Sequence, residues 1–370
     1  MADRSRPFTG ASLSAPTRAV RAAPDRLGAL LAVLTPLSFL LLLYVTIVDE
    51  APTTWAAAGL YAALAVLLCL RVARRHTWLP FVLPALSLYL LFAVFPALNA
   101  FRVSLYAWSG FGEPTDYVGL ANYQSVVVSP VFWNALWHNV LIFLSIFVLQ
   151  NVVGLFLAVL IHARPRGYEF YRAAIFMPGI LSLVATGLMW QVIFGSNIGL
   201  LTPLLQDLGL GALTRDWLGD STLTFWLLVL VQFWQWMGLP MIIYLAGLQN
   251  VPEELIAAAR IDGANDAQAF RHVTFPLLAP AFTVMTALCF IVMFKTFDIP
   301  FVMAGPGGAP NGTTDVLSLV IYRTAFGLGT TVRTSLQQGY AVAIGVVMSL
   351  ALLVATTVQL AVLRRREVGQ

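Results

Sequence analysis

The chain has 370 residues, of which 59% are hydrophobic and only 10% charged, and its mean hydropathy is +0.82. Soluble domains carry roughly a quarter charged residues, so this composition excludes a water-exposed globule and predicts an all-α, polytopic membrane protein. The net charge of +4 does not indicate nucleic-acid binding, because the arginines lie at the edges of apolar segments.

Eight apolar segments follow along the chain, each near the roughly 20 residues that a helix needs to cross about 30 Å of hydrocarbon. The predicted domains are a tail at 1–26, a two-helix hairpin at 27–76 and a six-helix core at 77–367. The first segment is longer than a secretory signal core and lacks a small-residue cleavage site, so it is interpreted as a retained span. The eight segments are 27–48, 55–70, 79–100, 139–161, 174–194, 223–248, 277–302 and 340–363.

The basic residues predict the orientation, because Lys and Arg accumulate on the cytoplasmic side. With both termini inside, the cytoplasmic segments hold most of the 21 basic residues. The outer segments then hold only Arg102, Arg215, Arg323 and Arg333. The cytoplasmic group is Arg4, Arg6, Arg18, Arg21, Arg26, Arg71, Arg74, Arg75, Arg164, Arg166, Arg172, Arg260, Arg271, Arg364, Arg365 and Arg366.

A charged stretch, "EELIAAARIDGANDAQAFRHVTFPLLAP" at 253–280, interrupts the apolar pattern between two predicted spans. Asn250 is expected to cap a first short helix, and Pro252 suits its opening turn. Glu253 and Glu254 complement the positive end of the helix dipole. We call residues 250–280 the 250–280 loop.

The second half of this loop predicts another short helix. Gly263 is suited to the left-handed conformation that ends the first helix, and Asn265 to the cap of a second helix that runs to about Val273. Pro276 then opens the next span. Such a segment is either a connector at the lipid surface or a docking site for another protein.

The stretch resembles the cytoplasmic EAA loop of binding-protein-dependent ABC importer permeases. The motif "IDGA" at 261–264 is similar to the carbohydrate branch in particular. One position departs from the pattern: Ala257 stands where the family has glutamate, and the nearest replacement is Glu254, one turn earlier. The matching positions are Ala258, Ala259, Gly263, Val273 and Pro276.

Other segments resemble the same family over most of 79–367. They are "YVGLANY" at 117–123, "YRAAIFMPGILSLVATGLMW" at 171–190 and "TFDIPFVMAGPGG" at 296–308. The two extra N-terminal spans resemble those of maltose-type permeases.

The resemblance implies a permease subunit of an ATP-driven sugar importer in the inner (plasma) membrane. It implies a second permease subunit, a cytoplasmic ABC ATPase dimer, an extracytoplasmic solute-binding protein and a sugar substrate, and no cofactor, metal or catalytic site in this chain. The only lysine, Lys295, follows Phe294 instead of a glycine-rich turn, so a phosphate-cradling Walker loop is absent and ATP hydrolysis falls to a partner. The expected ATPase-coupling residues are Glu253, Glu254, Ala258, Ala259, Arg260, Asp262, Gly263 and Pro276.

The alternative is a secondary transporter driven by an ion gradient, which needs ionisable groups near the middle of the membrane. Lys295 lies about 27 Å along a helix from the start of its predicted span, so it and Asp298 are expected at the outer interface, where they pair three residues apart on one helix. His138 and His162 fall at predicted span ends. An intramembrane enzyme is a third alternative, which no group of catalytic residues supports.

The substrate path is predicted from polar and aromatic residues in mid-span. Gly238 and Pro240 interrupt the sixth span, and irregular backbone at that depth is tolerated only where it is buried or lines a cavity. Amides hydrogen-bond hydroxyls, and an indole offers a flat face to a sugar ring, although polar residues also hold membrane helices together. The path candidates are Gln232, Gln235, Trp236 and Leu239 on one face of the sixth span, with Thr283 and Thr286 on the seventh.

The remaining features carry no predicted chemistry. Gln150 and Asn151 are interpreted as polar residues that hold helices together. Cys69 and Cys289 lie in apolar runs and behave as small hydrophobic residues. The glycine-rich stretch 304–314 is expected to be a flexible outer loop.

Overall fold

The computed structural model describes residue 86 and residues 88–195, 199–328 and 337–367. The predicted tail at 1–26 and hairpin at 27–76 lie outside the described residues. The chain divides into two units, 1–98 and 99–370; the helix Phe95–Val103 begins in the first, and the helices that follow it lie in the second.

The described residues of this unit form helices and no strand beyond one isolated bridge, between Tyr106 and Tyr117. The all-helical prediction is therefore confirmed for the described part. The longer helices are α4 (Phe95–Val103), α5 (Ala121–Val128), α6 (Pro130–His162), α7 (Tyr168–Phe176), α8 (Leu183–Phe194), α10 (Ser221–Trp236), α11 (Gly238–Gln249), α12 (Glu253–Ile261), α15 (Ala279–Phe294), α17 (Leu317–Phe326) and α18 (Gln338–Glu367). The shorter ones are η2 (Met177–Ile180), α9 (Leu201–Asp207), η3 (Gly211–Leu213), α13 (Asp266–Ala269), η4 (Phe270–Thr274), α14 (Phe275–Leu277) and α16 (Asp298–Ala304).

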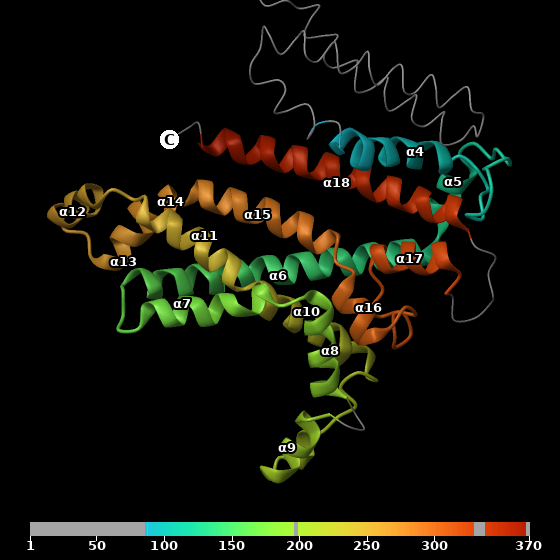
Figure 1. The fold of residues 1–370 in the computed structure, drawn as a ribbon. Helices are drawn as coiled ribbons and strands as arrows, with labels where there is room; N and C mark the ends of the chain where they lie inside the picture. The colour runs from blue at the N-terminus through green and yellow to red at the C-terminus, as the bar shows by residue number, and fades with distance from the viewer. Residues whose placement is uncertain (1–85, 87, 196–198, 329–336, 368–370) are drawn as a thin grey trace, which may run out of the picture. The chain divides into compact units, whose positions relative to one another are not determined.

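The central helix is α6, against which α11 and α15 pack (Figure 1). Ile142, Met241 and Met285, one from each of these helices, are almost fully buried in the shared core. The helices approach closely at Gly154 of α6, where an added Cβ would lie 2.6 Å from the Cβ of Pro240 in α11. This glycine therefore sets the distance between the two helices.

Two described helices are long and apolar enough to cross a membrane, α6 and the Gln338–Gln359 part of α18. Three further candidates are pairs of helices bent at a break, which gives up to five spans in the described residues. The predicted spans 139–161 and 340–363 agree with α6 and α18, while α6 begins at Pro130, capped by Ser129. His138 consequently lies inside a helix, not at its end as predicted.

The predicted continuous spans at 174–194 and 223–248 are each broken. The first bends by 96° between η2 and α8, where Pro178 opens a turn of 3-10 helix after α7. The second bends by 43° at Met237, between α10 and α11. At that bend Gly238 lies against α7, because an added Cβ would stand 2.7 Å from the Cα of Phe176.

The predicted helix 277–302 is also wrong as a single span. The 61° bend between α14 and α15 lies at its first residue, Leu277, and within the predicted span α15 already ends at Phe294. Lys295 caps that end and Asp298 begins α16, so the two do not lie three residues apart on one helix. Asn139 of α6 donates a hydrogen bond of 3.2 Å to the Met293 carbonyl, which stabilises the helix end from outside.

The stretch 304–314, predicted as a flexible loop, is instead held by specific contacts. Arg323 of α17 reaches back to the Gly307 carbonyl at 3.3 Å and to the buried carboxylate of Asp315. The Thr314 hydroxyl donates to the Ala309 carbonyl at 2.9 Å. His138 of α6 contacts the Asp315 carbonyl through Nδ1 at 2.9 Å.

Candidate coupling and translocation sites

The 250–280 loop begins both short helices where predicted, but its first cap differs. The second helix, α13, continues as the π-helical turn η4 and then α14, and ends at Leu277 instead of about Val273. The helix α12 begins at Glu253 with Pro252 as its N-cap, and Asn250 instead ends the preceding α11. Proline lacks the N–H that a first turn leaves unpaired, so it fits this place without a capping side chain. Glu253 and Glu254 occupy the first turn, where their charges favour the helix dipole.

The turn between the two helices is fixed by local hydrogen bonds. Gly263 has φ +87°, its N–H donates to the Arg260 carbonyl at 3.1 Å, and the Ala264 N–H donates to the Ala259 carbonyl at 3.0 Å. This pair of bonds is the Schellman motif, which ends a helix on a left-handed residue. Gly263 therefore has the conformation predicted for it.

The second helix begins with the predicted Asn265 cap. The Asn265 side chain accepts from the Gln268 N–H, and the Gln268 side chain accepts from the Asn265 N–H, both at 2.9 Å. Across the turn, Arg260 forms an ion pair of 2.9 Å with Asp266. Both side chains are largely exposed, so this pair orients the two helices more than it stabilises them.

The outer surface of α12 is open. Leu255 is 45% exposed and Ile261 86% exposed, and Glu253, Glu254 and Ala258 are also exposed. The adjoining α13 and η4 pack against the helix bundle, because Ala269 is buried and Phe270 contacts the core.

A small cavity of about 180 Å³ lies beneath this segment. It is lined by Arg260 and Asp266 and by Val159 and His162 at the end of α6. The loop therefore joins the bundle at one end of its central helix, where Figure 1 places α12 and α13. Pro276 lies within α14, the link to α15, so it does not open the next span as predicted; Pro280 stands in the first turn of α15.

Among the path candidates, Gln235 uses both ends of its side-chain amide in hydrogen bonds within the chain. Its Oε1 accepts from the Thr186 hydroxyl of α8 at 2.5 Å, and its Nε2 donates to the Leu181 carbonyl at 2.9 Å. Leu181 lies at the sharp bend between η2 and α8, so Gln235 satisfies backbone that the bend leaves unpaired.

Gln232, one turn earlier on α10, has a different environment. It is 1% exposed, and its Oε1 accepts from the Thr296 hydroxyl at 2.7 Å. Its Nε2 is buried without a hydrogen-bond partner in the described chain. Gln232 is thus the path candidate with an unused buried donor.

The other path candidates are distributed over several elements. Trp236 ends α10 and Leu239 follows the bend in α11, so the predicted face is not on one continuous helix. Thr283 and Thr286 donate to the carbonyls four residues earlier in α15, at 3.0 and 2.7 Å. Both hydroxyls are occupied locally.

Two asparagines of α6 form buried polar contacts with other helices, and the sequence singled out only one of them. Asn139 joins three helices, because its Oδ1 also accepts from the Leu317 N–H at 2.8 Å. Asn151, predicted to hold helices together, accepts from the Tyr244 hydroxyl of α11, which confirms that prediction. The only sequence signal for Asn139 is an amide within a long apolar helix.

A family model described as "Binding-protein-dependent transport system inner membrane component" matches residues 150–368, more than half of the chain. The chain belongs to this family. The match covers the 250–280 loop and every path candidate. This permease is accordingly a multi-pass component of the inner membrane.

Individual relatives extend the likeness beyond the family model. The permease is 34% identical to the "Probable ABC transporter permease protein YurN" of Bacillus subtilis, over 76% of this chain and 93% of that protein. It is 33% identical to the "Probable starch degradation products transport system permease protein AmyD" of Thermoanaerobacterium thermosulfurigenes, over 79% of this chain and 94% of that protein.

A solved structure has the same fold. It is a chain of a bacterial alginate ABC transporter in complex with an alginate pentasaccharide-bound periplasmic protein, with a TM-score of 0.67 and 19% identity. The alignment covers 80% of this permease and 96% of that chain. Family membership supports the prediction of a transport subunit and decides against the ion-gradient transporter.

Proposed function

We propose that this permease carries sugars as one transmembrane subunit of an ATP-driven importer. Carbohydrate as the substrate class is supported by the names of its relatives, which include permeases for starch degradation products and for arabinooligosaccharides. The observation that carries the coupling role is the open surface of α12, on a turn held by local hydrogen bonds.

The proposed assembly contains a second permease subunit, a cytoplasmic ATPase dimer and an extracytoplasmic solute-binding protein. The need for a separate ATPase follows from the sequence, because the single lysine does not stand in a phosphate-binding loop. Both termini and the 250–280 loop are placed in the cytoplasm, as the basic residues predict.

In this proposal α12 docks on the ATPase. Its exposed Leu255 and Ile261 supply apolar contact, and the short Ala258 and Ala259 let the partner's backbone approach. Ala257 occupies the position of the family's glutamate, and Glu254 supplies the negative charge instead. Motion of α12 passes to α6 and α15 through the buried part of the loop. The proposed coupling set is Glu253, Glu254, Ala258, Ala259, Arg260, Asp262, Gly263 and Pro276.

The proposed substrate path runs along α10, α11 and α15. Gln232 is favoured within it, because its Nε2 is a buried donor with no partner in the described chain, and a sugar hydroxyl would satisfy it. The remaining proposed path residues are Gln235, Trp236, Leu239, Thr283 and Thr286.

The direct test is uptake into proteoliposomes that contain the purified complex, with the binding protein added outside and ATP enclosed. A panel of maltotriose, arabinotriose and raffinose is expected to include a sugar whose uptake requires both ATP and the binding protein. Uptake that persists without ATP and follows an imposed proton or sodium gradient would refute the proposal.

A further inference from the structure

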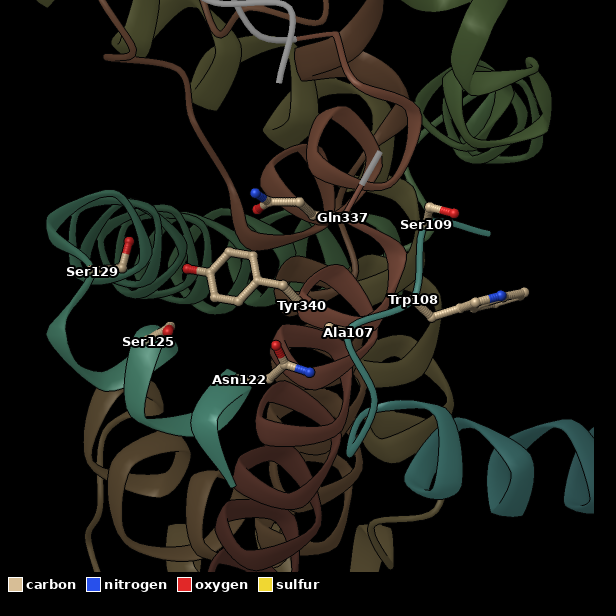
Figure 2. Close-up of a pocket in the computed structure, with 8 residues that line it drawn as sticks. All are labelled: Ala107, Trp108, Ser109, Asn122, Ser125, Ser129, Gln337 and Tyr340. Carbon is tan, nitrogen blue, oxygen red and sulfur yellow. The ribbon is translucent and has the colours of Figure 1, made fainter. Parts of the chain in front are cut away.

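A cleft of about 700 Å³ lies at the end of α6 opposite the 250–280 loop, at Ser129, the residue that caps the start of this 33-residue helix (Figure 2). A helix of that length spans about 50 Å, so the cleft and the loop are at opposite ends of the bundle. The cleft shares no residue with the proposed path. Its lining is Ala107, Trp108, Ser109, Asn122, Ser125, Ser129, Gln337 and Tyr340.

Most of the described lining residues have polar side chains, and none of these described residues is charged. The hydroxyls of Ser109, Ser125 and Tyr340 and the amide of Gln337 form no hydrogen bond with the described part of the chain. Figure 2 shows Ser125 and Tyr340 on facing sides of the cleft, whereas the Trp108 indole points away from the other side chains. Several donors and acceptors are therefore free to bind a ligand.

The walls of the cleft are fixed by hydrogen bonds that do not use these free groups. The Asn122 side-chain nitrogen donates to the carbonyls of Ser104 and Tyr106, at 2.8 and 3.0 Å. At the start of α18 the Gly339 N–H donates to the Trp108 carbonyl at 3.0 Å. The Asn122 oxygen remains available, because no described residue donates to it. The cleft is consequently formed before any ligand binds.

This combination of groups has a definite chemical preference. Because its described lining residues carry no charge, they offer little attraction to an ion. Hydroxyl and amide groups around an aromatic ring match a molecule with many hydroxyls and an apolar ring face. The volume lies in the range of ordinary small-molecule sites. We propose that this cleft binds a neutral saccharide, at a second site apart from the translocation path. The inference rests on the proposed function only for the choice of test sugars.

Protection of a single cysteine tests the site directly. In a variant without Cys69 and Cys289, Ser125→Cys places a thiol in the cleft, and Thr222→Cys places an exposed control at the start of α10. Purified permease in nanodiscs is treated with an impermeant maleimide and maltotriose, arabinotriose or raffinose. At least one sugar is expected to slow modification of Ser125→Cys about tenfold at ten times its dissociation constant, while Thr222→Cys is unaffected.

Removing the Tyr340 hydroxyl tests whether this group contacts the ligand or the residue only packs against the core. Tyr340→Phe keeps the ring against the core and is expected to weaken the protecting sugar about 2- to 12-fold, the effect of one hydrogen bond. The matched control Tyr322→Phe removes a hydroxyl from a ring packed among Phe297, Phe301 and Phe326, outside the cleft. It is expected to leave protection unchanged.

Four results would overturn the proposal. They are protection by none of the three sugars, equal protection by a charged alginate trisaccharide, unchanged protection in Tyr340→Phe, and shielding of Ser125→Cys only when the second permease subunit is added. Uptake by the wild-type complex is measured separately. Intact uptake with no cleft binding therefore contradicts this inference alone, and absence of ATP-dependent uptake contradicts the proposed function.

Discussion

Arg323 forms a two-pronged ion pair with Asp315, with Nη1 and Nη2 at 2.6 and 2.7 Å from Oδ1 and Oδ2. The two side chains are only 16% and 5% exposed. The pair fastens the loop that follows α16 to α17 and so restrains this loop.

Breaking the pair from one side is expected to be costly. Arg323→Ala leaves a buried, uncompensated carboxylate and should lower the free energy of unfolding by about 3 kcal/mol. The double variant Arg323→Ala with Asp315→Ala should lose less, because no buried charge remains. The stability of the two variants is measured by thermal unfolding in detergent and by proteolysis of the loop. If the double variant loses as much stability as Arg323→Ala, or more, this account is wrong.

The same pair predicts a pH dependence. Burial raises the pKa of Asp315 above its usual range, and the hydrogen bonds and charge of Arg323 oppose that rise. The folded protein then holds this proton more tightly than the unfolded chain, so stability falls as pH rises from the ordinary aspartate value through the raised pKa. In Arg323→Ala the fall in stability should extend to higher pH, because the pKa of Asp315 rises further. In Asp315→Asn this pH dependence should disappear. Unfolding midpoints measured across pH test both expectations.

Gly154 is expected to tolerate no side chain. Gly154→Ala would force the Pro240 ring of α11 away from α6 and should cost about 1–3 kcal/mol. The control is Gly345→Ala in α18, whose added Cβ would have its nearest neighbour at 3.9 Å. That change should be neutral or stabilising by up to about 1 kcal/mol. Equal unfolding midpoints for the two variants would refute the close approach.

Substitution of the two glutamines of α10 is expected to have different effects, on helix packing at Gln235 and on transport at Gln232. Gln235→Leu removes two hydrogen bonds of about 0.5–1.5 kcal/mol each and unpairs the Leu181 carbonyl, so assembly and unfolding temperature should fall. Gln232→Leu removes one hydrogen bond, from the Thr296 hydroxyl, and should lower assembly less than Gln235→Leu while it raises the sugar concentration needed for half-maximal uptake. Assembly, basal ATPase activity and uptake are measured for both glutamine variants. Normal uptake by Gln232→Leu would show that Gln232 does not line the substrate path.

Gly263 tests the coupling role of the 250–280 loop. An added Cβ would meet nothing within 4 Å, so the cost of Gly263→Val is the left-handed backbone alone, about 1–2 kcal/mol. Uptake and ATPase copurification should fall together while membrane insertion persists. Gly263→Asn, a residue that accepts this conformation, is the control and should retain both. Normal uptake and copurification in Gly263→Val would make the loop a connector only.

The orientation is tested by thiol labelling in a background without Cys69 and Cys289. Ala267→Cys in the loop and Asn311→Cys beyond α16 are both at exposed positions. An impermeant reagent should label only Asn311→Cys in intact cells and both in permeabilised cells. Labelling of Ala267→Cys from outside would reverse the topology and exclude the loop from contact with a cytoplasmic ATPase.

The 250–280 loop was largely predictable, because its structure depends on neighbouring residues. The Asn265 cap and the left-handed Gly263 each satisfy backbone groups within a few positions, so their chemistry is visible in the sequence. The exception is Asn250, where a residue suited to an N-cap instead ends α11. Pro252 itself suffices to start α12.

The bends and the ordered loop after α16 were not predictable from the apolar pattern. Hydropathy records which segments avoid water, but not where a helix breaks. The breaks depend on distant partners: Gln235 supports the bend at Leu181 from 54 positions away, and Asn139 binds the start of α17 from 178 positions away.

The sequence alone determined that the chain is an all-helical membrane protein and pointed, through the 250–280 loop, to its family, because composition, capping and turn chemistry are local properties. Only the tertiary structure decided that the glycine-rich loop is closed by Asp315 and Arg323, that the path glutamines differ, and that a polar cleft opens beside Tyr340. Each of these depends on hydrogen bonds and close packing between helices far apart in the chain, where burial makes every unpaired polar group costly.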